Sequence, residues 1–122
     1  MAQARIGIVI RTKDRPLFVA RALRCVLTQT CRDWSVVLVN DGGDTSVLQR
    51  AIAADDLTAP FADGRMRVLT HAQSVGRSEA FNRAAAMLDT EFVCCLDDDD
   101  TWEPEFLERL VAFHDATRSL AP

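Results

Sequence analysis

Four consecutive aspartates, Asp97 to Asp100, are the residues whose type and spacing most plainly suggest chemistry. Adjacent carboxylates repel one another, and a divalent cation removes that repulsion. Mg²⁺ and Mn²⁺ prefer oxygen ligands, and Mg²⁺ is often held by carboxylates together with substrate phosphates. If the run is extended, Asp97 and Asp99 share the metal side and Asp98 and Asp100 lie opposite. The alternative is a solvated acidic turn before a helix, where carboxylates favour the N-terminal end of the helix dipole.

Other polar residues follow the three earlier apolar runs of the chain. They are Arg11 to Arg15, Asn40 to Gly43, and Thr70 with His71. Ligands of an open parallel sheet bind beyond the carboxyl ends of its strands, so we expect these clusters and the aspartates to meet at one edge. The donors and positive charges of the first cluster can contact a base, a ribose or a diphosphate, or they can cap a helix and lie on the surface.

The remaining candidates each have an ordinary interpretation as well. Asp41 can accept a hydrogen bond from a base N–H, but Asp-Gly is also a common turn pair. Arg77 can reach a phosphate or serve as surface charge. His71 is a possible site residue, although an ordinary polar loop histidine is the preferred interpretation. Trp34 and Trp102 can stack on a ring, although packing at the sheet edge is preferred.

The elements that must position these residues alternate along the chain. Apolar runs about 30 residues apart, the length of a βαβ unit, predict strands at Ile6–Ile10, Val36–Val39, Met66–Leu69 and Phe92–Leu96. Helical patterns predict helices from Pro16 to about Gln29, from a Ser46 cap through Ile52, after Gly76 with Ala80, Ala84, Met87 and Leu88 inward, and from Pro104 through Phe106, Leu107, Leu110, Val111 and Phe113. Right-handed crossovers then give an α/β fold, a Rossmann-like three-layer αβα arrangement with a mostly parallel four-stranded sheet.

The composition fits one globular domain over residues 1–122, with 48% hydrophobic and 26% charged residues. A net charge of −4 argues against a nucleic-acid surface, which needs clustered basic residues. The apolar runs are too short to span a membrane, and the N-terminus lacks a signal-peptide core. We therefore expect a cytoplasmic protein or a cytoplasmic piece of a larger one. The four cysteines lack zinc-ligand spacing and are expected to be buried, reduced thiols.

In order, these residues resemble the motifs of the inverting family 2 glycosyltransferases over nearly the whole chain. The similar segments are Ile8–Pro16 (opening strand and nucleotide loop), Gln29-Thr30 and Trp34 (helix end), Val39–Gly43 (second-strand motif), Gly76–Asn82 (glycine-to-asparagine helix segment), and Leu96–Asp100 with Trp102 and Pro104 (metal-binding D-x-D region). Each motif is weak alone, but four of them in register are a specific signal.

The resemblance implies a GT-A type fold and a nucleotide-diphosphate sugar donor, often a UDP-sugar, for transfer to a glycan or lipid acceptor. It implies Mn²⁺ or Mg²⁺ as the cofactor, which would neutralise the departing diphosphate. By position it assigns Thr12, Asp14 and Arg15 to the base and ribose pocket, Asp41 to the base, Asp98 to the ribose, and Asp97 and Asp99 to the metal. Bacterial polysaccharide or cell-wall glycan synthesis is the expected setting.

The sequence also departs from the family pattern. Arg11 and Lys13 replace a common proline and aromatic residue, and Asn40 replaces a frequent aspartate, so the base identity stays open. Phe81 stands where an arginine is common, and Arg77 can supply that phosphate contact.

The family's acceptor-binding half and its general base lie beyond the D-x-D region. No carboxylate of this chain fits the base that takes the acceptor proton. We therefore expect the donor-binding half of a transferase, with a non-catalytic nucleotide-binding, metal-binding or interaction module of the same fold as the alternative. A phosphoryl-transfer domain is disfavoured, because it needs a lysine late in the chain and Lys13 is the sole lysine.

Overall fold

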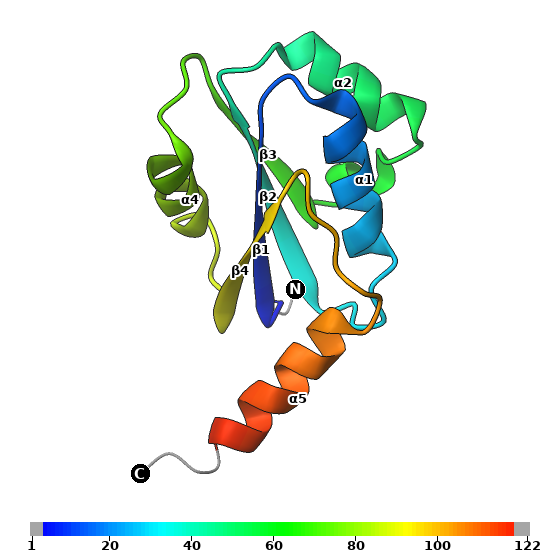
Figure 1. Cartoon of the computed structure of the whole chain (residues 1–122), viewed down its shortest axis with the longest axis vertical. Coiled ribbons are helices and arrows are strands. Elements are labelled where there is room, and N and C mark those ends of the chain that lie inside the picture. Colours follow the sequence, from blue (N-terminus) through cyan, green and yellow to red (C-terminus); the bar gives the residue numbers. More distant parts are fainter. Residues whose placement is uncertain (1–3, 119–122) are drawn as a thin grey trace.

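The computed structural model describes residues 4–118, and at its centre lies a sheet of parallel strands in the order β3-β2-β1-β4 (Figure 1). The strands are β1 (Ile6–Thr12), β2 (Trp34–Asp41), β3 (Met66–His71) and β4 (Phe92–Asp97). β1 and β2 are central and almost fully buried, which explains their continuous apolar runs. The predicted α/β class with a four-stranded parallel sheet is confirmed.

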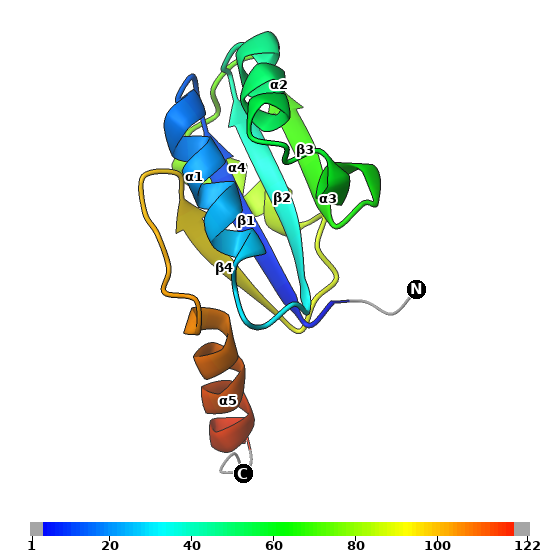
Figure 2. The same ribbon diagram turned by 90° about the vertical axis from the view of Figure 1, so that its right-hand side faces the viewer.

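Helices cover both faces of the sheet. They are α1 (Pro16–Leu27), α2 (Thr45–Ala54), the short α3 (Ala59–Ala62), α4 (Arg77–Ala85) and α5 (Phe106–Arg118). Figure 2 shows α1, α2 and α3 in front of the sheet with α4 behind it, while α5 extends away beyond the amino ends of the strands. No helix among residues 4–118 combines the length and the apolar character needed to cross a membrane.

The core has two parts because successive strand residues point to opposite faces. Ile8 and Ile10 pack with Leu23 of α1 and belong to the larger cluster, which also reaches Leu107 of α5. Val9 faces the other way and belongs to a smaller cluster under α4. The sheet is thus anchored on both sides, and its carboxyl edge is held in place for the loops that follow.

The strands are longer than predicted, since their ladders continue into polar residues. Thr12 pairs in register with Asn40, and Asp41 pairs with His71. These polar side chains therefore stand on the sheet itself and not in the loops beyond it. Their positions are fixed by the backbone ladder, which gives the edge its rigidity.

Three helix predictions need correction. α1 ends at Leu27, short of Gln29. Ser46 does not cap α2, because Asp44 accepts the Ser46 N–H at 2.9 Å and takes the cap position. Pro104 lies two residues before α5 and does not open it.

The predicted inward face of the third and last helices is also partly wrong. Met87 and Leu88 come after α4 ends, although both pack against the smaller core cluster. Phe113 is 69% exposed, whereas Leu107, Leu110 and Val111 of the same helix pack in or against the larger core cluster. The four cysteines form no disulfide, but the expected burial is wrong: Cys95 is exposed, and the other three are only partly buried.

Candidate functional site

The polar clusters meet at the carboxyl edge of the sheet around a small cavity of about 70 Å³. Its lining residues come from the ends of β1 and β4, the first loop and the start of α4: Arg11, Thr12, Lys13, Arg15, Arg77, Asp97, Asp98 and Asp99. Among the site residues expected from the sequence, Asp14 and Asp41 do not line this cavity. Positive and negative side chains thus face one another across a few ångströms.

The acidic run forms a turn, so the condition of an extended run, on which the two-sided arrangement of its carboxylates depended, is not met. The Asp100 N–H donates to the Asp97 carbonyl at 3.0 Å, which closes the turn directly after β4. Side-chain oxygens of Asp97, Asp99 and Asp100 consequently come within 4.8 Å of one another. Asp100, predicted to lie on the opposite side, therefore joins the two expected metal ligands.

Asp98 is the member of the run that turns inward. It is 5% exposed, and its two oxygens accept hydrogen bonds from Thr12 Oγ1 and Arg15 Nη1, both at 3.0 Å. These contacts join the last strand to the first loop. Thr12, Arg15 and Asp98, which the sequence assigned to one pocket, are brought together by the structure.

The other three carboxylates fit a hard divalent cation. Arg15 approaches Asp99 only at 3.9 Å, and within residues 4–118 no cationic side chain lies within 4.0 Å of Asp97 or Asp100. Three converging oxygen donors with so little cationic compensation match the donor set that Mg²⁺ or Mn²⁺ prefers. Asp97, Asp99 and Asp100 are therefore the residues that could hold the ion.

A second acidic group lies near the amino end of the sheet and is already neutralised. Glu91, His114 and Asp115 are close together. Arg5 donates to both carboxylates, and His114 and Arg118 also approach Glu91. This network fastens α5 to the start of β4, and we do not regard it as a metal site.

Asp41, expected to bind a base, is a fully buried hub at the end of β2. Five residues surround its carboxylate: Arg11 (Nε, 2.8 Å), Ser74 (Oγ, 2.9 Å), Val75 (N–H, 2.9 Å), His71 (Nδ1, 3.1 Å) and Gly76 (N–H, 3.2 Å). Burial raises the pKa of Asp41, but the hydrogen bonds from Val75, Arg11, His71 and Ser74 outweigh it and hold the pKa well below its usual range. The ionised carboxylate thus links β1, β2, β3 and the loop before α4 through hydrogen bonds and an ion pair.

His71 is not the loop residue that was preferred from the sequence. It is the last residue of β3, is 9% exposed and lies beside Asp41. The sequence did carry a signal for His71. Asp41 and His71 each follow the apolar run of their strand at the same distance, and the two strands are neighbours. Equal positions on neighbouring parallel strands place the two side chains side by side, which the prediction did not take into account.

The loops at this edge are tied to one another by close contacts. Asp14 adopts a left-handed conformation, with φ of 52°, and its Oδ1 accepts the Asp44 N–H at 2.7 Å. Gly42 has φ of 87°, and a Cβ there would lie 2.6 Å from the Ser74 nitrogen, so only glycine fits this approach. Asp14 therefore supports the second-strand turn from behind and does not face the acidic run.

One supporting feature was missed in the sequence. Polar side chains at four-residue spacing, on α1 and just after its end, hold residues 99–107, a segment that begins within the acidic run and that we call the strap. Arg21 donates to the Asp99 carbonyl (2.9 Å), the Trp102 N–H donates to Cys25 Sγ (3.0 Å), Gln29 Nε2 donates to the Glu103 carbonyl (2.8 Å), and the Leu107 N–H donates to Gln29 Oε1 (3.0 Å). The i, i+4, i+8 spacing was the available signal.

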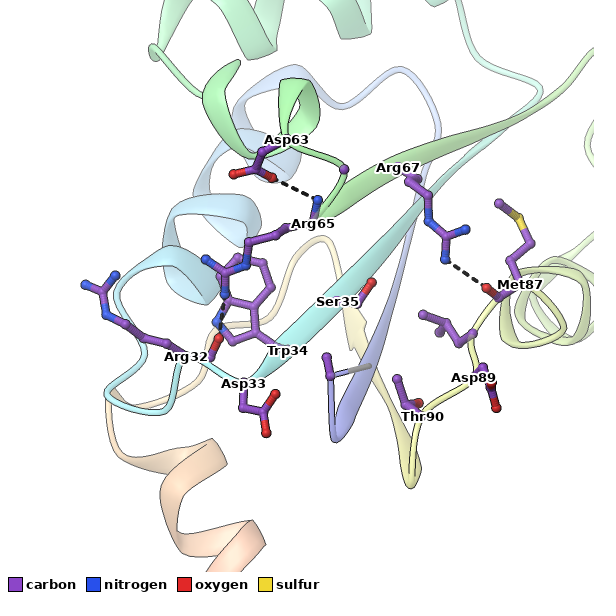
Figure 3. A pocket seen from close by; sticks show the side chains of 13 residues that line it. Arg32, Asp33, Trp34, Ser35, Asp63, Arg65, Arg67, Met87, Asp89 and Thr90 are labelled. Carbon is purple, nitrogen blue, oxygen red and sulfur yellow. Dashed lines mark hydrogen bonds between the residues drawn. The ribbon is translucent and has the colours of Figure 1, made fainter. Parts of the chain in front are cut away.

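A larger hollow, of about 460 Å³, lies at the opposite end of the sheet (Figure 3). There Arg65 stacks over the buried Trp34 ring at 3.8 Å and donates to the Arg32 carbonyl at 2.6 Å. Arg67 donates to the Met87 carbonyl at 2.8 Å. Both arginines interact with neutral groups. Trp34 is packed inside the protein, as preferred in the sequence analysis over stacking on a ligand ring.

Residues 7–121 match the family described as Glycosyl transferase family 2. The chain belongs to this family. This family 2 chain is 32% identical to the uncharacterized glycosyltransferase alr2836 of Nostoc sp. (strain PCC 7120) and 30% identical to the succinoglycan biosynthesis protein ExoW of Rhizobium meliloti. The alignments cover 88% and 97% of this chain but 32% and 35% of those proteins. The chain thus spans about a third of the length of these relatives.

Solved structures show the same fold for this family 2 chain. It matches mannosyltransferase PcManGT from Pyrobaculum calidifontis, in complex with GDP-Man and Mn²⁺, with a TM-score of 0.75 over 91% of this chain and 32% of that one. It matches S. aureus TarS 1-349, in complex with UDP, with a TM-score of 0.77 over 92% and 32%. Identity is 21% in both cases. These glycosyltransferases confirm the predicted GT-A fold.

Proposed function

We propose that this chain is the donor-binding half of a metal-dependent glycosyltransferase that uses a nucleotide-diphosphate sugar. One observation carries the proposal: three carboxylates converge beside a cavity lined by four cationic side chains. A divalent ion bound to a diphosphate presents both signs of charge in this arrangement. Membership of family 2 supports the proposal, and so do the GDP-Man, Mn²⁺ and UDP in the complexes of two proteins with this fold.

The roles follow from the placement of the side chains. Asp97, Asp99 and Asp100 would hold Mn²⁺ or Mg²⁺, which would supply charge neutralisation to the departing diphosphate. Arg77, the first residue of α4, lines the cavity at a helix N-terminus, where phosphate is favoured. Within residues 4–118 it has no carboxylate within 4.0 Å, so its charge is available to a phosphate.

The nucleoside end of the donor is assigned to the first loop. Thr12 and Arg15 line the cavity and hold Asp98, which we propose approaches the ribose. Asp14 and Asp41 lie behind this surface and are proposed to shape the base side of the pocket by fixing its loops.

The donor is proposed to be a UDP-sugar, as the family resemblance favours, and the acceptor a glycan or lipid. The general base that takes the acceptor proton would come from outside these residues. A cytoplasmic location and a role in bacterial polysaccharide synthesis are also proposed, the latter supported by the likeness to ExoW. A non-catalytic module of the same fold is the alternative.

Isothermal calorimetry with UDP and GDP, with and without Mn²⁺ or Mg²⁺, tests the proposal. We expect binding that requires the metal and is weakened at least about tenfold by Asp99→Asn. Asp89→Asn, an exposed aspartate at the opposite end of the sheet, is the matched control and should bind like the unchanged protein. Binding that ignores the metal, or equal effects of the two substitutions, would overturn the proposal. A partner whose binding survives Asp99→Asn would favour the module.

A further inference from the structure

Arg11 stands between the buried Asp41 and the cavity. Its Nε and Nη2 lie 2.8 and 2.7 Å from the same Asp41 oxygen, and Nη2 lies 3.4 Å from Ser74 Oγ. The Asp41 side chain has no exposed surface, whereas that of Arg11 is 27% exposed and lines the cavity. A ligand in the cavity therefore meets the guanidinium before it meets the carboxylate.

Asp41 has no acceptor capacity to spare for a base. A carboxylate offers about four lone-pair sites, and donor groups from five residues already surround this one. Admitting a base N–H would displace one of them and leave a buried donor without a partner. The direct contact between Asp41 and a base, expected from the family resemblance, is thus disfavoured in this chain.

The cations around the cavity fall into two kinds. Arg11 is paired with Asp41 and Arg15 with Asp98, while Lys13 and Arg77 have no carboxylate within 4.0 Å among residues 4–118. Uncompensated charges suit phosphate oxygens, and a compensated guanidinium suits a neutral, polar group. The Arg11 side chain also reaches from β1 toward β2 and β3, away from the converging carboxylates on the β4 side. It therefore faces the base end of a bound nucleotide.

We propose that Arg11 selects the base of the donor by its exocyclic group. A guanidinium carries five N–H donors and no acceptor, and Arg11 Nη1 makes no hydrogen bond within the described part of the chain. It can donate to the keto oxygen at C4 of uracil or C6 of guanine, but it meets the amino group at C4 of cytosine or C6 of adenine donor to donor. This inference rests on the proposed function, because it requires a nucleotide in this cavity.

Calorimetry in the presence of Mn²⁺ with UDP, CDP, GDP and ADP tests the selection. UDP and CDP are the sharpest pair, since their bases differ only at the exocyclic position and the adjacent ring nitrogen. We expect UDP and GDP to bind at least about tenfold more tightly than CDP and ADP, as for one good arginine–base contact. If none of the four binds, the proposed function fails. If all four bind alike, the function stands and the role of Arg11 is refuted.

Substitutions identify the residue responsible. Arg11→Gln offers both a donor and an acceptor and should bring the UDP-to-CDP ratio to within about threefold. Lys13→Gln removes a charge from the same cavity and should weaken all four nucleotides by a similar factor, keeping the ratio. Arg11→Lys remains a pure donor, so it should keep the direction of the preference if Arg11→Gln proves poorly folded. An unchanged ratio in folded Arg11→Gln would overturn the inference.

Discussion

The two ends of the sheet carry similar charged residues in very different electrostatic states. At the amino end, Arg65 and Arg67 donate to main-chain carbonyls around a hollow of about 460 Å³. At the carboxyl end, the cavity is about 70 Å³, but Asp97 and Asp100 have no cationic partner within 4.0 Å in the described part of the chain. Converging carboxylates without a cationic partner, and not the size of the hollow, therefore distinguish the site.

The carboxyl end itself combines two uses of aspartate. Asp41 is buried and bound by donors from five residues, so its charge holds strands and loops together. The carboxylates of the acidic turn are more exposed and converge on one point. The comparison predicts that changes at the hub act on stability, that changes at the turn act on ligand binding, and that changes at the amino end do little of either.

The largest effect on stability is expected for Asp41→Ala. It leaves Arg11, His71 and two backbone N–H groups buried beside a missing carboxylate, and breaking such a buried pair costs about 3–5 kcal/mol. Urea unfolding followed by circular dichroism measures the loss. Asp41→Asn keeps the shape and some hydrogen bonds and should lose less. A change below about 1 kcal/mol for Asp41→Ala would show that the hub is not a structural tie.

The next effect concerns acid. Because the folded pKa of Asp41 is lowered, its contribution to stability is complete above the unfolded pKa of about 3.9 and is lost as pH falls through the folded pKa. The free energy of unfolding of the wild-type chain should therefore drop below about pH 4 more steeply than that of Asp41→Asn.

Salt separates this effect from the amino end. Hydrogen bonds from Arg5 also lower the pKa of Glu91 and Asp115, but these carboxylates are exposed. At about 0.5 M salt the contribution of Glu91 and Asp115 to the pH dependence of stability should be screened, while the contribution of the buried Asp41 remains. If the free energy of unfolding fell equally steeply with acid for the wild-type chain and for Asp41→Asn at high salt, Asp41 would not be the source of the acid sensitivity.

A smaller effect is expected for Gln29→Leu, which loosens the strap. The substitution leaves the Glu103 carbonyl and the Leu107 N–H unpaired, at a cost of about 1–3 kcal/mol. It should also weaken Mn²⁺ binding, because the strap begins at Asp99. Thr28→Ala is the control, since its exposed hydroxyl contacts only carbonyls of its own helix. Lost stability with unchanged Mn²⁺ affinity would mean that the strap does not position the metal ligands.

The smallest effect is expected for Arg67→Ala at the amino end. It removes one exposed hydrogen bond to a carbonyl, so stability should change by less than about 1 kcal/mol. Mn²⁺ and nucleotide affinities, measured by calorimetry, should be unchanged. A severalfold loss of nucleotide affinity would show that the larger hollow takes part in binding and would overturn the comparison.

The sequence predicts the strands well, because a strand buried on both faces leaves an uninterrupted run such as Val36–Val39. It also predicts which polar clusters share an edge, since parallel strands end together. The end of α1 and the cap of α2 were misplaced by one to a few residues, as expected where only local signals decide.

Details of the site could not be predicted, because contacts distant in the chain determine them. Asp41 meets His71 and Ser74 across separations of 30 and 33 residues; the matching strand ends pointed to His71, but no local pattern pointed to Ser74. The sequence left open whether the acidic run is extended or turned, because an aspartate repeat does not reveal the turn that the Asp100 N–H closes. Phe113 looked buried because helical spacing does not show where a helix leaves the core.

The strand order has a consequence for how the chain is synthesised. Of the four strands of this sheet, β1 emerges from the ribosome before the others and its sheet neighbour β4 after them, and their ends are joined through Thr12 and Asp98, 86 residues apart. Until β4 arrives, one edge of an isoleucine-rich strand has no partner, and such an edge readily pairs with other nascent chains. Every molecule therefore passes through an aggregation-prone interval that ends with the step that brings the acidic turn to the first loop.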